Sequence, residues 1–271
     1  MIKVYYVDTF TNKAFKGNPA AVCITESALD DTTMQNVANE LNLSETAFVH
    51  CLNKSQNLYN IRWFTPKTEV NLCGHATLAA THILLTKKYI KTDEVNFYAS
   101  KDALKLQAKK SSMGITLNFP VDVLIEPDED LKDKLLSALK LPPSSPIYQG
   151  KLTKQVLIEV KNEQVLRNLQ PNFAELLKIN YNLTGVAITA NSLTYDFVSR
   201  FFDPWEGINE DPVTGSAHTA LGPYWSKKLN KNTLNAKQIS SRGGKLKLKL
   251  NRQRILITGE AITTLIGEII V

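Results

Sequence analysis

The second half of the sequence repeats the order of motifs in the first half, and this duplication constrains the fold more than any other feature. The motif RWFTP at 62–66 is echoed by RFFDP at 200–204, 138 residues later in a chain of 271. The motif NLSETA at 42–47 matches NLTGVA at 182–187 in the same order. Each of these follows an amphipathic run typical of a helix, at 31–41 and at 171–179. The chain is therefore predicted to contain two copies of one unit.

Each copy is predicted to be an α+β lobe in which short alternating strands surround a helix of small residues. The two helices are predicted to begin at Gly74 and Gly215, and the alternating segments KDALKLQ (101–107) and GGKLKLKL (243–250) to be matching strands. The strand-like ends of the chain could pair with each other and close the first lobe. The predicted lobes are residues 1–120, completed by a C-terminal strand at about 258–271, and residues 121–257.

Composition excludes several classes of protein. With 43% hydrophobic and 21% charged residues, the chain can bury a sizeable core, and no apolar run is long enough to span a bilayer. The start, MIKVYYVDTF, lacks the apolar region and cleavage site of a signal peptide. Three distant cysteines without a CxxC pair, and four histidines without ligand spacing, favour a reducing cytoplasm and predict no metal site.

The basic balance of the chain does not by itself indicate nucleic acid. The formal net charge is +6, but lysines and arginines are scattered, and their densest segment is KLKLKLNRQR at 245–254. Its alternation is typical of a strand with one apolar and one solvated basic face, and no stacking aromatics are interleaved. We therefore expect neither a nucleic-acid nor a membrane partner. A positive protein could help to capture small acidic substrates.

Matched positions that differ chemically between the two copies are the best candidates for function, because shared positions are explained by the fold. Glu45 is matched by Gly185, so only the first copy has an acid there. A carboxylate bordered by apolar residues tends to have a raised pKa, which suits it to take and return a proton. The structural alternative is a surface glutamate at the edge of a strand.

The predicted helix starts differ as well. Cys73 and His75 of the first copy are matched by Thr214 and Ser216, and Asp211 of the second copy has no acidic counterpart. Each has a structural explanation too, since Asp before Pro favours turns and Thr is a good helix cap.

The stretch VNLCGHATLAA at 70–80 places a thiol, a glycine and an imidazole where a loop becomes a helix. A helix start exposes unpaired N–H groups and the positive end of the dipole, so it can bind an anion, and glycine allows close approach. A tight helix entry with a buried cysteine and a histidine satisfied by a carbonyl would explain the same residues.

The motifs FKGNPAAV, NLSETAFV, TPKTEVNLCGHATLAA and DPVTGSAHTALGPYW resemble the PhzF-like (phenazine biosynthesis PhzF) family along nearly the whole chain. The resemblance implies the diaminopimelate epimerase-like fold: two similar lobes, each a sheet or barrel wrapped around a central helix, with the active-site cleft between them. It also implies a cofactor-independent isomerase that acts like PhzF, which shifts a proton on trans-2,3-dihydro-3-hydroxyanthranilate. The family is usually a homodimer.

The resemblance also implies roles for individual residues. Glu45 of NLSETAF would be the proton shuttle, and His75 and Asp211 would line the site with it, so these three are the predicted catalytic residues. The predicted substrate-binding residues, which would hold a small carboxylate-bearing molecule, are Asn18, Gly74, Thr214, Gly215 and Ser216. No cofactor is expected.

One departure from the wider fold class limits the chemistry. Diaminopimelate epimerases use one cysteine from each lobe, whereas this chain has Cys73 in the first copy and Thr214 in the second. Threonine is a poor base, so a two-thiol racemase is excluded. The alternatives that stay open are a one-thiol epimerase or racemase using Cys73 with Glu45, and a non-catalytic ligand-binding protein of the same fold.

Overall fold

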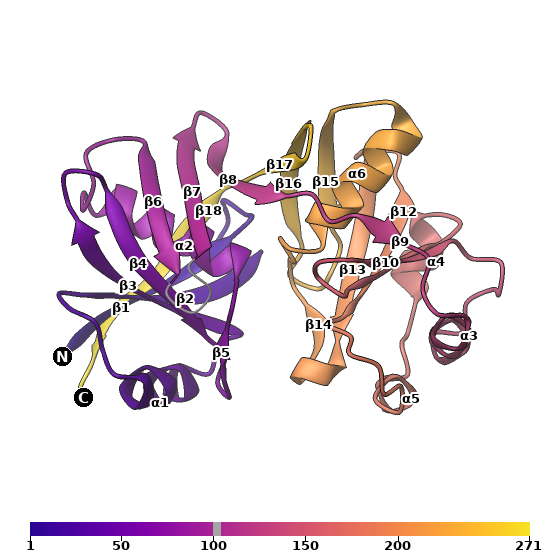
Figure 1. Cartoon of the computed structure of the whole chain (residues 1–271), viewed down its shortest axis with the longest axis horizontal. Coiled ribbons are helices and arrows are strands. Elements are labelled where there is room, and N and C mark those ends of the chain that lie inside the picture. The colour runs from indigo at the N-terminus through magenta and orange to yellow at the C-terminus, as the bar shows by residue number, and fades with distance from the viewer. Residues whose placement is uncertain (100–103) are drawn as a thin grey trace. The chain divides into compact units, whose positions relative to one another are not determined.

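The computed structural model describes residues 1–99 and 104–271, and it divides into two compact units (Figure 1). The first lobe comprises Met1–Phe119 and Leu256–Val271, and the second lobe comprises Pro120–Ile255. The start of the strand expected at 101–107 lies outside the described residues, and the strand observed there is β7 (Leu104–Ser111).

Both lobes consist mainly of strands. Those of the first lobe are β1 (Ile2–Thr9), β2 (Asn18–Thr25), β3 (Glu45–Asn53), β4 (Leu58–Phe64), β5 (Glu69–Val70), β6 (Glu94–Ala99), β7, β8 (Gly114–Pro120) and β18 (Ala261–Ile269). Those of the second are β9 (Leu124–Ile125), β10 (Ile147–Gly150), β11 (Val156–Glu159), β12 (Val186–Asn191), β13 (Phe197–Asp203), β14 (Ile208–Asp211), β15 (Thr233–Gln238), β16 (Gly244–Asn251) and β17 (Arg254–Gly259), which crosses the boundary.

Few helices accompany these strands. The first lobe has α1 (Asp31–Leu41) and α2 (Gly74–Thr86). The second has α3 (Glu129–Ala138), α4 (Glu163–Asn168), α5 (Phe173–Leu176), the short 3-10 helix η1 (Pro204–Glu206) and α6 (His218–Leu229).

The strand pairing confirms that the lobes repeat one topology. In the first lobe β2 and β3 are parallel, β4 is antiparallel to β3 and β5, β4 and β6 are parallel, and β6 and β7 are antiparallel. In the second lobe β11 to β16 repeat these pairings in the same order. The register repeats too, since Trp63 pairs with Val70 and Phe201 with Asp211. In addition, β1 pairs with β18, so the two ends of the chain meet in the first lobe, as the sequence suggested.

Helix α2 begins at Gly74, as predicted, and is buried in the first lobe. Its first eight residues, of which most are small or apolar, are all buried. The helix packs against β1, β2 and β3. A helix that is buried on every side can be apolar all round, which explains why the sequence lacks a polar face here.

The prediction that the second helix begins at Gly215 is wrong: α6 begins at His218, after a turn at 215–217. In α2 the Cys73 carbonyl accepts the backbone N–H four residues later, from Thr77 (3.2 Å). In the second lobe the matching Thr214 carbonyl is bonded by the His218 ring (Nδ1–O 2.7 Å), and the His218 N–H donates to the Gly215 carbonyl (3.1 Å). The first turn is therefore tightened to 3-10 spacing.

Two further features of the second-lobe helices follow from backbone hydrogen bonding. Pro223 inside α6 cannot donate to the Thr219 carbonyl, which accepts instead from the Asp122 N–H (3.1 Å). The helix expected at 171–179 is only the four residues of α5, because the turn that follows it closes with bonds to the third residue back, from Lys178 to Glu175 (3.2 Å) and from Ile179 to Leu176 (3.0 Å).

Candidate functional site

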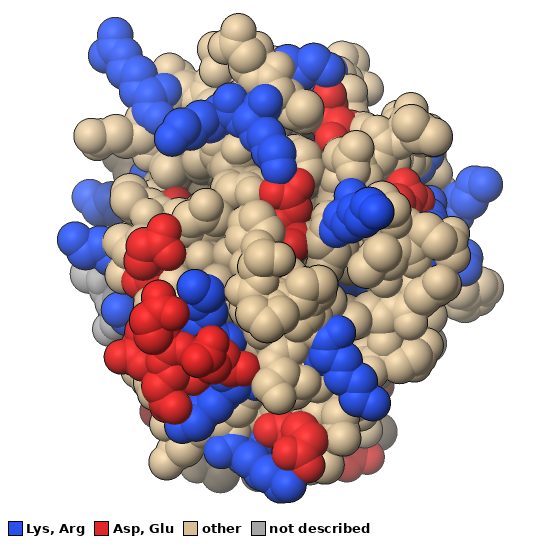
Figure 2. Space-filling model, turned by 90° about the vertical axis from the view of Figure 1, so that its right-hand side faces the viewer, with Lys and Arg blue, Asp and Glu red and all other residues tan. Residues whose placement is uncertain are grey.

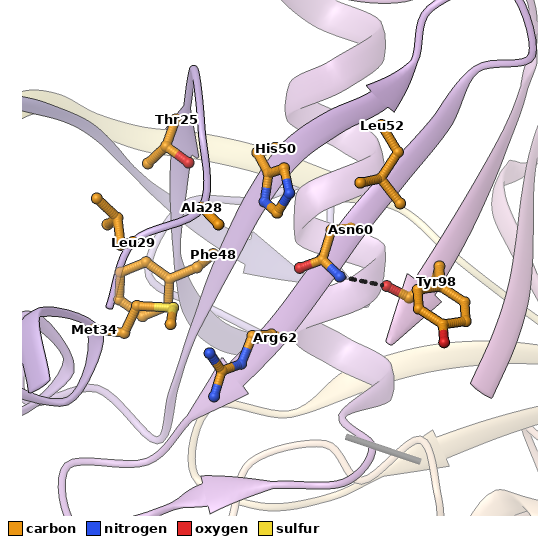
Figure 3. A pocket seen from close by; sticks show the side chains of 10 residues that line it. All are labelled: Thr25, Ala28, Leu29, Met34, Phe48, His50, Leu52, Asn60, Arg62 and Tyr98. Carbon is orange, nitrogen blue, oxygen red and sulfur yellow. Dashed lines mark hydrogen bonds between the residues drawn. The ribbon is translucent and has the colours of Figure 1, made fainter. Parts of the chain in front are cut away.

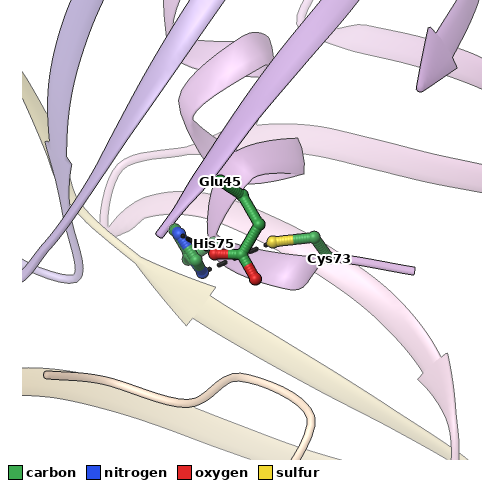
Figure 4. Close-up of side chains that lie close together, drawn as sticks. All are labelled: Glu45, Cys73 and His75. Carbon is green, nitrogen blue, oxygen red and sulfur yellow. Dashed lines mark hydrogen bonds and ion pairs between the residues drawn. The ribbon is translucent and has the colours of Figure 1, made fainter. Parts of the chain in front are cut away.

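Two predicted catalytic side chains, Glu45 and His75, come together with Cys73 of the alternative thiol mechanism in the first lobe (Figure 4). Glu45 is the first residue of β3, Cys73 immediately precedes α2, and His75 is the second residue of α2. The Glu45 Oε2 atom lies 3.2 Å from His75 Nε2, and His75 Nδ1 lies 3.4 Å from Cys73 Sγ. The imidazole thus links the carboxylate to the thiol.

The protonation of this group follows from its burial. His75 is 6% exposed, and burial lowers its pKa to about 4, so the ring is neutral at pH 7 and carries one proton. An ionised Glu45 can only accept, which places that proton on Nε2 and leaves Nδ1 to accept from the Cys73 thiol. In the resting arrangement the thiol donates to Nδ1, and the protonated Nε2 lies beside the carboxylate without a recorded hydrogen bond to it.

A metal ion is the other species that such a group could bind, because one ligand atom from each of the three residues lies within 4.8 Å of the other two. Each ring nitrogen of His75, however, already faces a partner within the group. A ligand role for His75 would require one of these contacts to break. The geometry therefore favours proton transfer over metal binding.

The start of α2 offers backbone donors beside this group. Cys73 makes no side-chain cap bond, the first turn has no acid, and within the described residues no partner is recorded for the N–H groups of Gly74 and His75. Asn18, which is fully buried, is the first residue of β2, two positions before Ala20, the residue that pairs with Glu45. The first lobe therefore brings together Glu45, Cys73 and His75, and Asn18 lies on the strand that pairs with the start of β3.

In the second lobe, the predicted residues Asp211, Thr214, Gly215 and Ser216 lie on one turn. The Thr214 hydroxyl donates to Asp211 Oδ2, and the buried Gln238 amide bonds to Asp211 and Thr214. The Ser216 hydroxyl accepts from Gln155 Nε2 (3.0 Å). Every hydrogen-bonding group of Thr214 is occupied within the lobe, whereas Ser216 is only half-buried.

Asp203, near this turn, carries a strongly shifted carboxyl group. Burial raises its pKa to about 7, and the negative charges of Glu206 and Asp211 add to the effect. The matched residue of the first lobe is Thr65, so the duplicated scaffold does not require an acid at this position. Two carboxyl groups, those of Asp203 and Asp211, therefore lie in this region, and that of Asp203 is partly protonated at neutral pH.

Sequence reasoning missed three side chains of the second-lobe site: Gln155, Gln238 and His218. The strand register aligns Gln238 with Ala99 of the first lobe, and His218 follows Thr214 as Thr77 follows Cys73. A comparison of matched positions along these strands and helices identifies Gln238 and His218 as differences between the lobes. Gln155 lies in the loop before β11 and had no comparable signal in the sequence.

A different cavity, of about 280 Å³, lies in the first lobe among α1, β3, β4 and β6 (Figure 3). Its walls combine apolar side chains such as Leu29, Met34 and Phe48 with the polar His50 and Asn60. Side chains alternate along β3, so Phe48 and His50 project from the face opposite to Glu45. This cavity contains none of the predicted site residues.

On the face in Figure 2, lysine and arginine side chains are interspersed with acidic ones and do not gather into one continuous basic region. Among residues 1–99 and 104–271, the structure contains no helix long and apolar enough to cross a bilayer.

Comparison with known proteins defines the class. A solved phenazine biosynthesis protein of the PhzF family from Enterococcus faecalis is 37% identical, with a TM-score of 0.88 over 100% of this chain and 99% of that one. A probable proline racemase from Agrobacterium radiobacter is only 11% identical, but its TM-score of 0.60, over 100% of this chain and 93% of that one, shows the same fold. The expected α+β, diaminopimelate epimerase-like fold is confirmed.

The family follows from the sequence matches. The model of the phenazine biosynthesis-like (PhzC-PhzF) family matches residues 7–267. A relative named as an uncharacterized isomerase in Halalkalibacterium halodurans is 46% identical, with 98% of each chain covered. The chain belongs to the phenazine biosynthesis-like family, and it is an isomerase.

Proposed function

We propose that this isomerase moves a proton between two carbon atoms of a small carboxylate-bearing molecule, without a cofactor, and that Glu45 carries the proton. The observation that supports this proposal best is the contact of the Glu45 carboxylate with a buried, neutral imidazole (3.2 Å). A neutral imidazole beside the carboxylate does not fix it as an ion, as a guanidinium would. Glu45 can then gain and lose a proton during the reaction.

The proposed step is balanced within the substrate. Glu45 takes a proton from one carbon, the electron pair left behind shifts along the adjoining double bond, and the same carboxyl group returns the proton to a second carbon. No oxidant, reductant or leaving group is needed. General acid–base catalysis of this kind contributes typically 10²–10⁴-fold to a rate.

Binding of the substrate is proposed to use the residues at the start of α2 and on the turn before α6. The N–H groups at Gly74 would hold a carboxylate, helped by the dipole of α2 and by Asn18. Gly215 and Ser216 are proposed to contact the substrate. Thr214 would act through Asp211, because its own polar groups are occupied within the lobe.

Substrate chemistry of the trans-2,3-dihydro-3-hydroxyanthranilate type is proposed from the family resemblance, as are catalytic roles for His75 and Asp211. The same resemblance leads us to propose a homodimer. The small number of scattered cysteines leads us to propose a cytoplasmic location.

The substitution Glu45→Gln tests the proposal, since it keeps the size of the side chain but removes the exchangeable proton. A panel of small carboxylates is incubated with the protein in D₂O, and deuterium incorporation at carbon is followed by NMR. The variant is expected to fold normally and to lose incorporation by at least 10²-fold. Glu40→Gln on the exposed side of α1 is the matched control and should retain the wild-type rate. Wild-type incorporation by Glu45→Gln would refute the role of Glu45.

A one-thiol epimerase is the second candidate, favoured by the Cys73 Sγ–His75 Nδ1 distance of 3.4 Å. In that mechanism His75 would take the thiol proton and Cys73 would act as the base. Iodoacetamide distinguishes the candidates in a Cys51→Ser background, because Cys51 is exposed whereas burial raises the pKa of Cys23 to about 12. If Cys73→Ala folds and keeps most of the exchange rate, the thiol mechanism is excluded, and complete loss of exchange would favour it.

A further inference from the structure

The Gln238 side chain holds both ends of the Asp211–Thr214 turn. It is fully buried on β15, and its Oε1 atom accepts from the Thr214 N–H (3.0 Å). Its Nε2 atom donates to the Asp211 carbonyl (2.8 Å) and to the Thr214 hydroxyl oxygen (3.2 Å). Only one orientation of the amide satisfies all three bonds, because a backbone N–H can only donate and a carbonyl can only accept.

These bonds give the Thr214 hydroxyl a fixed direction. Its oxygen accepts from Gln238, so its proton is available for the Asp211 carboxylate, to which it donates. The Thr214 carbonyl is held independently by His218 Nδ1 (2.7 Å). A continuous chain of donors therefore runs from the Gln238 amide through Thr214 to Asp211.

The fold itself does not require the three hydrogen bonds of Gln238. The strand register aligns Gln238 with Ala99, a small buried residue that cannot bond to the corresponding turn of the first lobe. That lobe nevertheless forms the same strands and its central helix. A buried amide must be fully hydrogen-bonded to avoid a desolvation cost, so a glutamine here is explained by what it holds in place.

We propose that Gln238 is a positioning residue that fixes the orientation of the Asp211 carboxylate through the Thr214 hydroxyl. This inference rests on the proposed role of Asp211 in proton transfer. Gln238 does not touch the substrate. When a catalytic carboxylate is displaced by about an ångström, the reaction rate can fall by on the order of 10²-fold.

A double-mutant cycle tests the inference with the D₂O exchange assay. Gln238→Met removes all three bonds at nearly constant volume, and Asp211→Asn removes the carboxylate. We expect Gln238→Met to lower kcat by about 10–100-fold with little change in KM. The double variant should be no slower than Asp211→Asn within about threefold, because both changes remove the same contribution.

Thr189→Val is the stability control, because it removes buried hydrogen bonds to Val198 and Trp225 elsewhere in the same lobe. It should retain the wild-type kcat. Amide hydrogen exchange at Thr214 supplies a readout that needs no substrate, and it should accelerate in Gln238→Met. If Gln238→Met does not fold, Thr214→Val replaces it in the cycle, because it breaks the same relay at the hydroxyl.

The inference is overturned if Gln238→Met keeps kcat within about twofold of wild type, or if its effect adds in full to that of Asp211→Asn. It is also overturned if Gln238→Met is slow while Asp211→Asn is not. Failure of the proposed proton shuttle appears separately, as wild-type exchange by Glu45→Gln, and leaves the cycle at Gln238 and Asp211 interpretable.

Discussion

The two lobes build the same strand scaffold but use the space around it differently. Both carry an arginine that forms two hydrogen bonds to a glutamate, Arg62 with Glu69 and Arg200 with Glu210, and each guanidinium lies over the phenylalanine two residues on. Such repeated contacts belong to the scaffold. The chemical groups that could perform a reaction are the ones that are not repeated.

The outer faces of the sheets show the same contrast. In the second lobe α3, α4 and α5 supply residues to one apolar cluster that includes Ala190 and Val198 of the sheet, both fully buried. The matched residues of the first lobe are His50 and Asn60, which line the open cavity beside α1. In the first lobe only part of this face is covered by an apolar cluster, which includes Met34 and Phe48, and the part around His50 lines a cavity instead.

The position of Glu45 shows that packing decides which lobe can hold an acidic side chain there. Its counterpart, Gly185, has a φ of +118°, and a Cβ atom there would lie 2.3 Å from the Phe201 ring. The second lobe therefore has no room for a side chain where the first lobe presents its acid. The asymmetry that the sequence showed as Glu against Gly is thus a difference in packing as well as in charge.

The largest effect on stability is expected from Gly185→Ala, which tests whether the second lobe has room for a side chain at this position. The added methyl group meets both the ring and an unfavourable backbone conformation, so we expect destabilisation by more than about 4 kcal/mol. Urea unfolding measures it. Gly267→Ala is a matched control, because a Cβ there meets only the end of the Leu265 side chain at 3.6 Å. A loss below about 1 kcal/mol at Gly185 would show that an acid could have been accommodated.

The two arginine–glutamate pairs should contribute differently to the free energy of unfolding although their geometry is shared. Arg200 Nη1 also donates to the carbonyls of Leu166 (3.2 Å) and Leu169 (2.7 Å), whereas Arg62 Nη1 bonds the exposed Asp31 (2.7 Å). Arg200→Met should therefore cost about 3 kcal/mol and Arg62→Met about 1–2 kcal/mol. Equal losses in urea unfolding would mean that the extra carbonyl bonds contribute nothing.

The pH dependence of stability should distinguish the contribution of Asp203 from that of the buried histidines. The pKa values of His75 and His218 are about 4, below the ordinary 6.5, so the unfolded chain binds more protons between these values. These histidines stabilise the fold above pH 6.5, and this contribution is lost as the pH falls toward 4. Asp203, with its pKa raised to about 7, acts in the opposite direction, since its ionisation destabilises the fold as the pH rises through 7.

The variant Asp203→Asn isolates this second contribution. It should be more stable than wild type by about 1 kcal/mol at pH 8.5 and show a smaller difference at pH 5.5. Urea titrations at both values make the comparison. A difference that does not change with pH would show that the carboxyl group titrates normally.

The duplication explains why much of this molecule was predictable. Ordered motif matches gave the lobes, the start of α2 and the asymmetry at Glu45, because the periodic pattern of strands and the glycine at a helix start are local signals. Gln238 and the true start of α6 were not predicted. Gln238 bonds to Asp211 and Thr214 from a strand farther along the chain, and no local pattern encodes such bonds. The start of α6 depends on the His218 ring, which takes the Thr214 carbonyl, and the periodic pattern of a helix does not show this bond.

The smallest effect is expected at the outer cavity of the first lobe. His50 faces the cavity, and partial burial lowers its pKa, but no hydrogen bond of its ring is recorded among the described residues. Removing the ring should therefore cost little, and His50→Ala is expected to change the unfolding free energy by less than about 0.5 kcal/mol. Phe48→Ala, in the same wall but 4% exposed and edge-on to Phe64 at 5.6 Å, should cost about 3 kcal/mol or more. If His50→Ala were as costly as Phe48→Ala, the part of this face around His50 would also belong to the stabilising core, as the matched Ala190 does in the second lobe, and the contrast between the two outer faces would disappear.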